Sequence, residues 1–269
     1  MATTVRVVPR ASMLAMFGEK YSFWELQDML LKLWAFFLRR NPKDVTLDDP
    51  PSFFTPKNLE RARRYNILPV FFPKLSIHWE QRLGPKQKPW IKLGDEFYLM
   101  VEENPGQRYE WMSLQQGWNL VDLTPVSSFG TEDDPLWPLI ASIRKEHEIG
   151  RYSDTPAGSR YDISAEEWRQ KVCPLVERTI LRMQPAGLCR LEPATVYNVM
   201  CNAFDADRQR FRIGEWLNET VPLTKHTRLN LVVGDILDKE SFRSVSLQES
   251  RDAFSSVAAR PIICFPSVC

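Results

Sequence analysis

Large apolar side chains crowd the stretch Tyr21–Pro42, YSFWELQDMLLKLWAFFLRRNP, and leave only a narrow polar stripe along it. At about 100° per residue, this stripe consists of Glu25, Asp28, Lys32 and Arg39. A serine–glutamate capping box opens the pattern, and an Asn-Pro pair closes it. The pattern predicts a helix from about Phe23 to Arg40.

The apolar arc of this helix is too wide for one neighbouring surface and needs cover on two or three sides. Its longest unbroken apolar run, Leu33–Leu38, is far shorter than the roughly 20 residues of a bilayer span, so a transmembrane helix is excluded. A helix on a membrane surface is disfavoured, because the polar stripe has no cationic excess. Two interpretations remain: a core helix, or a helix partly covered by another chain through Trp24, Trp34 and Phe37.

A second helix and a series of short strands follow. Thr55 as N-cap with Pro56 after it predicts a helix that runs to about Tyr65. Short apolar runs then predict strands in ILPVFF (67–72), RYEWMSL (108–114) and WNLVDLTP (118–125). A hairpin with a Gly-Asp turn is predicted in WIKLGDEFYLMVEE (90–103).

The helical period returns in the middle of the chain. Asp134-Pro135 predicts the start of a helix that ends near Gly150, and a capping box of Ser164 and Glu167 predicts another helix. Pro174 lies inside this later helix. Because proline has no N–H and its ring collides with the preceding turn, a kink or a break is expected there.

The final third favours strands. Two runs rich in β-forming residues flank the polar turn DADRQ (205–209) and predict a hairpin over Val196–Trp216. LNLVVGDIL (229–237) and RPIICFPSV (260–268) predict two more strands. A short helix is predicted between Glu240 and Val257.

Hairpins and segregated helices together indicate an α+β fold rather than a repeat of βαβ units. We expect a helical N-terminal part, antiparallel hairpins in the middle and C-terminal third, and helices between them. The polar stretch IGRYSDTPAGSRYD (149–162) contains glycine and proline and predicts a boundary between regions 1–150 and 151–269. A single continuous domain fits the sequence equally well.

The use of glycine, histidine and cysteine narrows the chemistry. Only 11 of the 269 residues are glycine, which disfavours glycine-rich loops that cradle phosphates. Three isolated histidines and five cysteines without a C-x-x-C pair predict no zinc site, and we expect no cofactor. An odd number of unpaired thiols fits a reducing compartment, so we expect a cytoplasmic protein.

Two weak catalytic candidates remain. Asp205 and Asp207 could hold a divalent metal ion, although aspartates in a hairpin turn explain the pair better. His147 lies among carboxylates in RKEHEIGRYSD and could take part in acid–base chemistry. A charged helix end explains this pattern better, since neighbouring side chains on a helix point apart.

Positive charge is concentrated in the first third of the chain. Residues 1–92 contain 16 Lys and Arg against 8 Asp and Glu, whereas the remainder contains 19 against 26. Two mutually attracting faces of one protein explain this asymmetry, and a basic surface for a phosphate-bearing or acidic partner is the alternative. Candidates for nucleic-acid contacts, through phosphate neutralisation and base stacking, are Arg39, Arg40, Lys43, Arg61, Arg63, Arg64, Lys86, Lys88 and Trp90.

These observations favour a non-enzymatic interaction or structural component with an aromatic-rich surface for a protein partner or a second copy. Trp, Tyr and Arg dominate the energetics of interfaces, and the chain contains nine tryptophans. Nucleic-acid binding through the basic N-terminal half is the first alternative. A metal-dependent enzyme built on Asp205 and Asp207 is the second.

Overall fold

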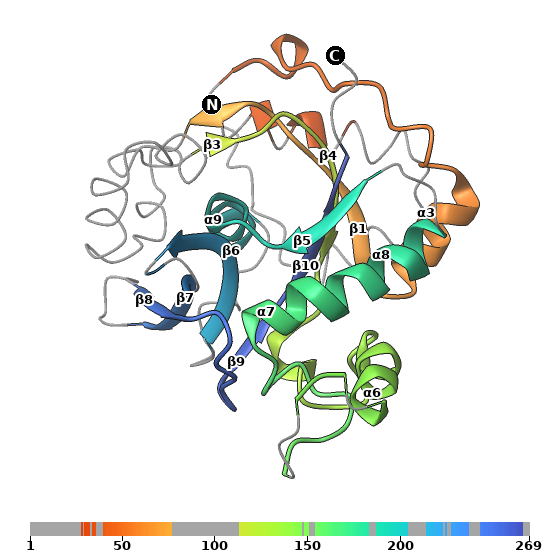
Figure 1. The fold of residues 1–269 in the computed structure, drawn as a ribbon. Helices are drawn as coiled ribbons and strands as arrows, with labels where there is room; N and C mark the ends of the chain where they lie inside the picture. Colours follow the sequence, from red (N-terminus) through yellow and green to blue (C-terminus); the bar gives the residue numbers. More distant parts are fainter. Residues whose placement is uncertain are drawn as a thin grey trace.

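The computed structural model describes residues 28, 30–32, 34–35, 40–76, 113–146, 148–150, 154–182, 187–203, 214–222, 224, 227–236 and 243–265. Within them the chain forms two four-stranded sheets and a two-stranded ladder, with helices beside the sheets (Figure 1). All but one of the described strand pairings are antiparallel. The α+β fold predicted from the sequence is therefore confirmed.

The first sheet has the strand order β1 (Ile67–Phe72), β4 (Gly117–Asp122), β10 (Pro261–Cys264) and β5 (Leu188–Leu191). Neighbouring strands are antiparallel throughout. Since β1 and β4 precede residue 150 and β5 and β10 follow it, this sheet combines strands from both sides of the predicted boundary. The apolar run predicted as β1 is confirmed, and every residue of β1 and β4 is buried.

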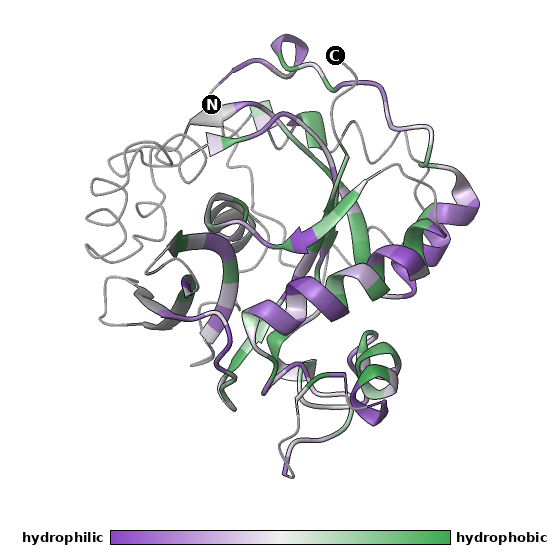
Figure 2. Cartoon of the chain, in the orientation of Figure 1, coloured by the Kyte–Doolittle hydropathy of each residue, from purple (hydrophilic) through white to green (hydrophobic). Residues whose placement is uncertain are grey.

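Both faces of the first sheet are covered, because alternate residues of its strands enter two different hydrophobic clusters. One cluster contains Val121 and Ile262 together with Trp34 from the N-terminal helical segment. The other contains Leu120 and Ile263. In Figure 2 the hydrophobic positions accordingly gather on the strands of this sheet and on the inner sides of the helices.

Helix α3 (Pro56–Arg63) begins where the sequence predicts. Thr55 is its N-cap, with its hydroxyl accepting a hydrogen bond from the Asn58 backbone N–H at 3.3 Å. The helix ends at Arg63, two residues before the predicted end, and packs against β1. Two 3₁₀ turns, η1 (Pro42–Asp44) and η2 (Val126–Ser128), and the ladder of β2 (Leu75–Ser76) with β3 (Ser113–Leu114) complete this region.

The predicted helix at Asp134-Pro135 is shorter than expected. It forms α6 (Trp137–Lys145), three residues after Asp134. The Asp134 carboxylate accepts a hydrogen bond from the Leu136 backbone N–H at 3.0 Å, which fixes a turn in front of the helix. The helix ends at Lys145, before the predicted end at Gly150.

A continuous helical segment follows, made of α7 (Ala165–Glu167), the π-helical turn η3 (Trp168–Val172) and α8 (Cys173–Leu181). The capping box of Ser164 and Glu167 is present in both directions. The helix does not break at Pro174. Instead, the turn before the proline widens, and the Cys173 N–H bonds to the Trp168 carbonyl five residues back, one of the known ways in which helices accommodate irregularity.

The second sheet has the order β8 (Arg243–Glu249), β7 (Arg228–Ile236), β6 (Gly214–Pro222) and β9 (Val257–Ala259). Only β6 and β9 are parallel. Arg260 alone separates β9 from β10, so the chain passes directly from the second sheet into the first. The strands predicted in LNLVVGDIL and RPIICFPSV are confirmed as β7 and β10.

The hairpin predicted over Val196–Trp216 is wrong in its first half, which forms helix α9 (Ala194–Ala203). Tyr197 and Met200 are fully buried at helical spacing. The Ala194 backbone N–H donates to both oxygens of the Glu219 carboxylate, at 2.9 and 3.0 Å, so this donor at the start of the helix is satisfied. These tertiary contacts override the local preference for a strand.

The helix predicted between Glu240 and Val257 is also wrong, because strand β8 occupies Arg243–Glu249 and pairs with β7. The segment RSVSLQE alternates polar and apolar residues, which is the period of a strand. The hairpin predicted at residues 90–103 and the turn at 205–209 lie outside the described residues.

Candidate functional site

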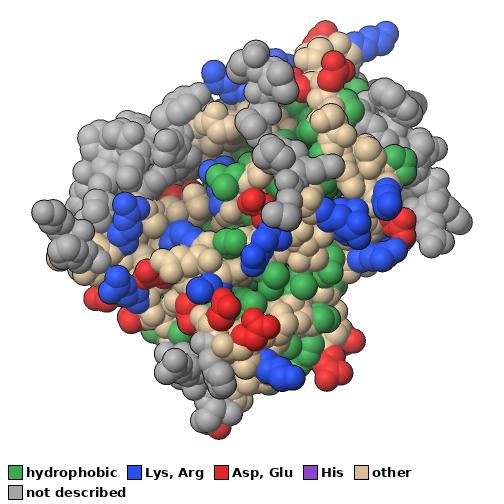
Figure 3. Space-filling model, turned by 45° about the vertical axis from the view of Figure 1, so that its right-hand side comes forward, with side chains coloured by type: hydrophobic (Ala, Val, Ile, Leu, Met, Phe, Trp, Pro, Cys, Tyr) green, Lys and Arg blue, Asp and Glu red, His purple; other side chains and the backbone are tan. Residues whose placement is uncertain are grey.

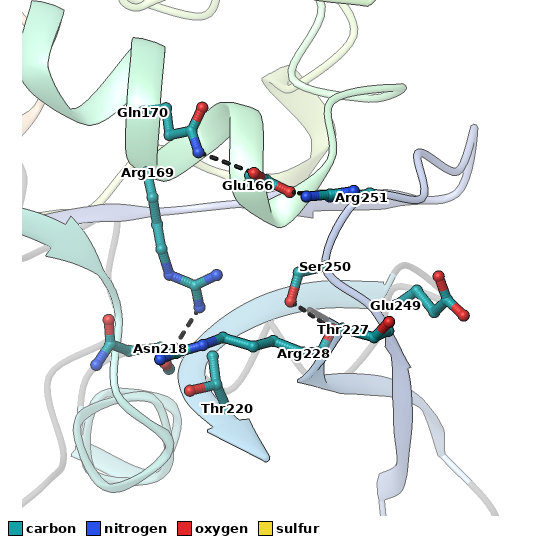
Figure 4. Close-up of a pocket in the computed structure, with 10 residues that line it drawn as sticks. All are labelled: Glu166, Arg169, Gln170, Asn218, Thr220, Thr227, Arg228, Glu249, Ser250 and Arg251. Carbon is teal, nitrogen blue, oxygen red and sulfur yellow. Dashed lines mark hydrogen bonds and ion pairs between the residues drawn. The ribbon is translucent and has the colours of Figure 1, made fainter. Parts of the chain in front are cut away.

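A polar hollow of about 440 Å³ lies between the α7–η3 segment and the end of the second sheet where β6, β7 and β8 meet (Figure 4). We call it the arginine hollow. It is lined by Glu166, Arg169, Gln170, Asn218, Thr220, Thr227, Arg228, Glu249, Ser250 and Arg251. Three arginines, two glutamates, amides and hydroxyls give the hollow a lining that suits a charged or polar group.

Arg169 reaches into the hollow from the π-helical turn. Its Nη1 donates to Asn230 Oδ1 at 2.7 Å, and its Nη2 donates to the Asn218 carbonyl at 3.2 Å. Asn230 is completely buried and is itself held, since its Nδ2 donates to the Leu217 carbonyl at 2.7 Å and Ser250 Oγ donates to its Oδ1 at 2.8 Å. The guanidinium of Arg169 is therefore oriented before any ligand arrives.

Arg228 approaches the same point from the beginning of β7. Figure 4 shows its side chain extending toward Asn218, below the guanidinium of Arg169. Burial lowers the pKa of Arg169, and the neighbouring charge of Arg228 contributes to that lowering, against the opposite effect of nearby anionic groups such as Glu219. The two like charges thus repel each other across the hollow, and a bound anion would relieve this repulsion.

The carboxylates of the hollow are directed elsewhere. Glu166 accepts hydrogen bonds from Gln170 Nε2 at 2.8 Å and from Arg251 Nε at 2.9 Å. Glu249 is exposed and points away from the guanidinium groups of Arg169 and Arg228 in Figure 4. The two inner arginines therefore have no bound carboxylate among the lining residues.

Glu219 lies on β6 between two lining residues, but it is buried behind the hollow. Burial raises its pKa to about 7, although hydrogen bonds from backbone N–H groups and the charges of Arg190 and Arg169 oppose the rise. This carboxyl group changes charge near neutral pH, and it does so beside the start of α9 and within the field of Arg169.

A separate group of buried charges holds the fold together. Arg160 is fully buried and donates to the carboxylates of Asp122 and Asp134, while Arg260 Nε donates to Glu215 Oε2 at 2.8 Å. Since each charged member of this group forms an ion pair with an opposite charge inside the group, we assign it a structural role. In the described part of the chain, no group of three or more His, Cys, Asp or Glu side chains could hold a metal ion.

The buried thiols are poorly suited to nucleophilic chemistry. Cys173 and Cys189 are both buried. Burial raises the pKa of the Cys189 thiol well above its ordinary value, and the nearby Cys173 adds to the rise. Because the thiolate is the reactive form, this rise disfavours nucleophilic chemistry at Cys189, and both side chains pack in the hydrophobic core.

Some of the basic residues predicted from the sequence do come together. Arg61 and Arg64 line a second hollow of about 340 Å³ between α3 and α8, with Lys57, Tyr65 and Arg182. The Arg61 Nη1 donates to the Ile180 carbonyl at the end of α8 at 2.7 Å, which is a helix-capping contact. Figure 3 shows basic side chains gathered beside hydrophobic ones on the face that carries these helices.

Other predicted residues lie elsewhere. Arg63 is exposed but does not line the second hollow, and Arg40 and Lys43 are exposed on the N-terminal segment. Trp34 is only 1% exposed and packs edge-to-face with Phe72, so the chain itself covers it. Trp24, Phe37, Arg39, Lys86, Lys88, Trp90, His147, Asp205 and Asp207 lie outside the described residues.

Sequence reasoning did not find Arg169 or Arg228. Arg169 is one of several charged residues in a helix, and Arg228 begins a strand, so neither stands in a motif. The one local signal is the proline inside the helix, which marks the irregular turn that presents Arg169.

Comparison with protein-family models, curated proteins and solved structures gives no match to this chain. Among the helices that the structure describes, none combines the length and apolar character needed to cross a membrane.

Proposed function

We propose that this protein acts by binding, as a non-enzymatic interaction component, and that the arginine hollow is its contact site. The observation that carries the proposal is the convergence of Arg169 and Arg228 on one hollow without a bound carboxylate between them. Charged groups arranged in this way recognise a complementary charge on a partner.

The rigidity around Arg169 supports binding as the role of the site. Its guanidinium is fixed by Asn230 and by the Asn218 carbonyl, so little side-chain freedom is lost when a ligand docks. Clustered residues with shifted pKa values are common at functional sites. The proposed partner is another protein or a second copy of this chain, and the unpaired buried thiols support a cytoplasmic location.

A fragment screen by ligand-observed NMR tests this function without knowledge of the partner. The library contains neutral, cationic and anionic fragments, and the proteins are the wild type, the double variant R169Q/R228Q and the control R178Q. Arg178 is an exposed arginine of α8 outside the hollow. We expect fragments that bind the wild type and R178Q but lose binding in R169Q/R228Q. A screen without hits, or with hits that ignore both arginines, would refute the proposal.

A second candidate function is nucleic-acid binding at the hollow between α3 and α8. The gathering of Lys57, Arg61, Arg64 and Arg182 there favours it. Binding of single-stranded and double-stranded nucleic acid should fall steeply with salt, since phosphate contacts release counterions. The variant R61Q/R64Q should lose this binding, and R63Q serves as the matched control because Arg63 does not line that hollow. Weak binding with a flat salt dependence would remove this candidate.

A further inference from the structure

Two of the three arginines of the arginine hollow, Arg169 and Arg228, form no ion pair with the described residues, although the charges of Glu219 and Glu166 act on Arg169 without contact. Arg169 makes two hydrogen bonds with the described residues, both to neutral acceptors. The guanidinium of Arg228 makes no hydrogen bond or ion pair with any residue that the structure describes. A negatively charged ligand would therefore find two guanidinium groups without a bound carboxylate at the point where the two side chains meet.

The donors around this point favour an oxyanion. A guanidinium has five N–H donors in a planar fork and accepts no hydrogen bond, so Arg169 still has donors beyond the two that it uses. Arg228 brings a second fork from another element. The hydroxyls of Thr220 and Thr227 also line the hollow and add donors. A group with several acceptor oxygens uses this arrangement best.

We propose that the arginine hollow binds a phosphate monoester, held between Arg169 and Arg228. This inference rests on the proposed binding function. A phosphate monoester has a charge of about −1.5 to −2 at pH 7 and three acceptor oxygens, and so balances two guanidinium groups. A carboxylate has one charge and two oxygens and leaves one of the two arginines without compensation.

The size of the hollow fits a phosphate that is attached to something larger. Its volume of about 440 Å³ equals roughly fifteen water molecules at about 30 Å³ each. This is within the range of small-molecule sites, about 300–1,000 Å³. Sugar phosphates and phosphorylated side chains share the same recognised group, and the test separates them.

The π-helical turn gives a structural reason for the position of Arg169. π-Helical turns are rare in proteins, and those that occur are frequently found at functional sites. Here the turn ends two residues before Pro174, and the widened backbone presents Arg169 to the second sheet, where Asn218 and Asn230 accept its hydrogen bonds. The π-helical turn therefore positions Arg169, one of the two arginines proposed to bind the phosphate.

Isothermal titration at low ionic strength and about pH 7.5, above the second phosphate pKa of about 6, tests the proposal. The probes are inorganic phosphate, phenyl phosphate, a sugar phosphate, a short phosphoserine peptide with its unphosphorylated match, and acetate. We expect phosphate-bearing probes to bind and acetate and the plain peptide to fail. R169Q and R228Q should each weaken binding by about tenfold or more, the scale of a charge-assisted hydrogen bond, while R178Q should bind like the wild type.

Comparison of the probes identifies the carrier of the phosphate. Tighter binding of the peptide indicates a phosphorylated protein, in agreement with the proposed protein partner. Tighter binding of the sugar phosphate indicates a small molecule and contradicts a protein partner at this hollow. Because Arg228 is exposed, R228Q should keep the fold even if R169Q does not, and circular dichroism checks both variants.

Two results would overturn the inference. One is acetate binding as tightly as phosphate, and the other is phosphate binding that R228Q leaves unchanged. If phosphate-bearing probes do not bind while the fragment screen still finds ligands that require both arginines, the phosphate inference fails and the binding function stands. If both experiments fail, both proposals fall.

Discussion

Replacement of Arg160 by methionine tests whether the buried charges are essential for the fold. Arg160 is fully buried, its Nη2 donates to Asp134 Oδ1 at 2.7 Å, and its Nη1 donates to Asp122. Burial by itself favours the protonated form of Asp122, but Arg160, Arg260 and hydrogen bonds hold the pKa of that carboxyl below its ordinary value. Methionine keeps the apolar stem of the side chain and removes the charge that both aspartates require.

The expected loss follows from the two carboxylates that remain. Removal of one partner from a buried ion pair costs about 3–5 kcal/mol, because it leaves an uncompensated charge in the interior. That is a large part of the roughly 5–15 kcal/mol that stabilises a typical domain. At acidic pH the difference in the free energy of unfolding between R160M and the wild type should shrink. In the variant, protonation neutralises the aspartates that have lost their partner. The wild type loses its ion pairs as pH falls through the low folded pKa of Asp122.

Urea denaturation at pH 7 and at about pH 4.5 measures these free energies of unfolding. The surface pair of Arg64 with Glu60, 71% and 62% exposed, supplies the control, because R64Q should cost less than about 0.5 kcal/mol. A triple variant, R160M/D122N/D134N, should recover part of the stability by removing the stranded charges. If R160M costs no more than R64Q at pH 7, the reasoning about the buried charges is wrong.

Three further predictions concern other parts of the fold. From about pH 4.5 to 7, Glu219 is ionised in the unfolded chain but protonated in the folded chain, so the free energy of unfolding of the wild type falls as pH rises. The contribution of Glu219 to this fall is roughly 3 kcal/mol. In urea denaturation across this pH range, E219Q should not show that contribution. W34A should cost about 3–5 kcal/mol in the same assay, since Trp34 is buried. T55A should cost about 1 kcal/mol through loss of the N-cap bond.

Local hydrogen-bonding signals proved the most reliable guides to the fold. The caps at Thr55 and Ser164 are satisfied by backbone N–H groups three residues away, so every partner lies within one short stretch of sequence. The apolar run of β1 could also be recognised within a few residues, because burial on both faces makes all six positions apolar, although its strand partner β4 is distant in the sequence. Elements whose sequence pattern is local could be predicted from the sequence alone.

Helix α9 shows why the remaining elements could not. The residues around Tyr197 have side chains that favour strands, and the sequence contains no local cap that opposes this preference. The cap comes from Glu219, 25 residues further along the chain. A partner that only the folded chain brings near decides the element, and no window of local sequence contains that information.

The arginine hollow could not be predicted from the sequence for two reasons. Only the folded chain brings its residues together, as with α9, and the net charge of the surrounding region has the opposite sign. Arg169 and Arg228 belong to residues 93–269, where acidic residues outnumber basic ones by 26 to 19, so net charge directs attention to the N-terminal third. A charged ligand, however, is affected mainly by charges within about one Debye length, roughly 8–10 Å, and not by the net charge of the whole region. Within the hollow, Arg251 already neutralises Glu166, and the inner arginines set the local sign. An anion is therefore attracted by the arrangement of a few side chains in an acidic region, which composition cannot reveal.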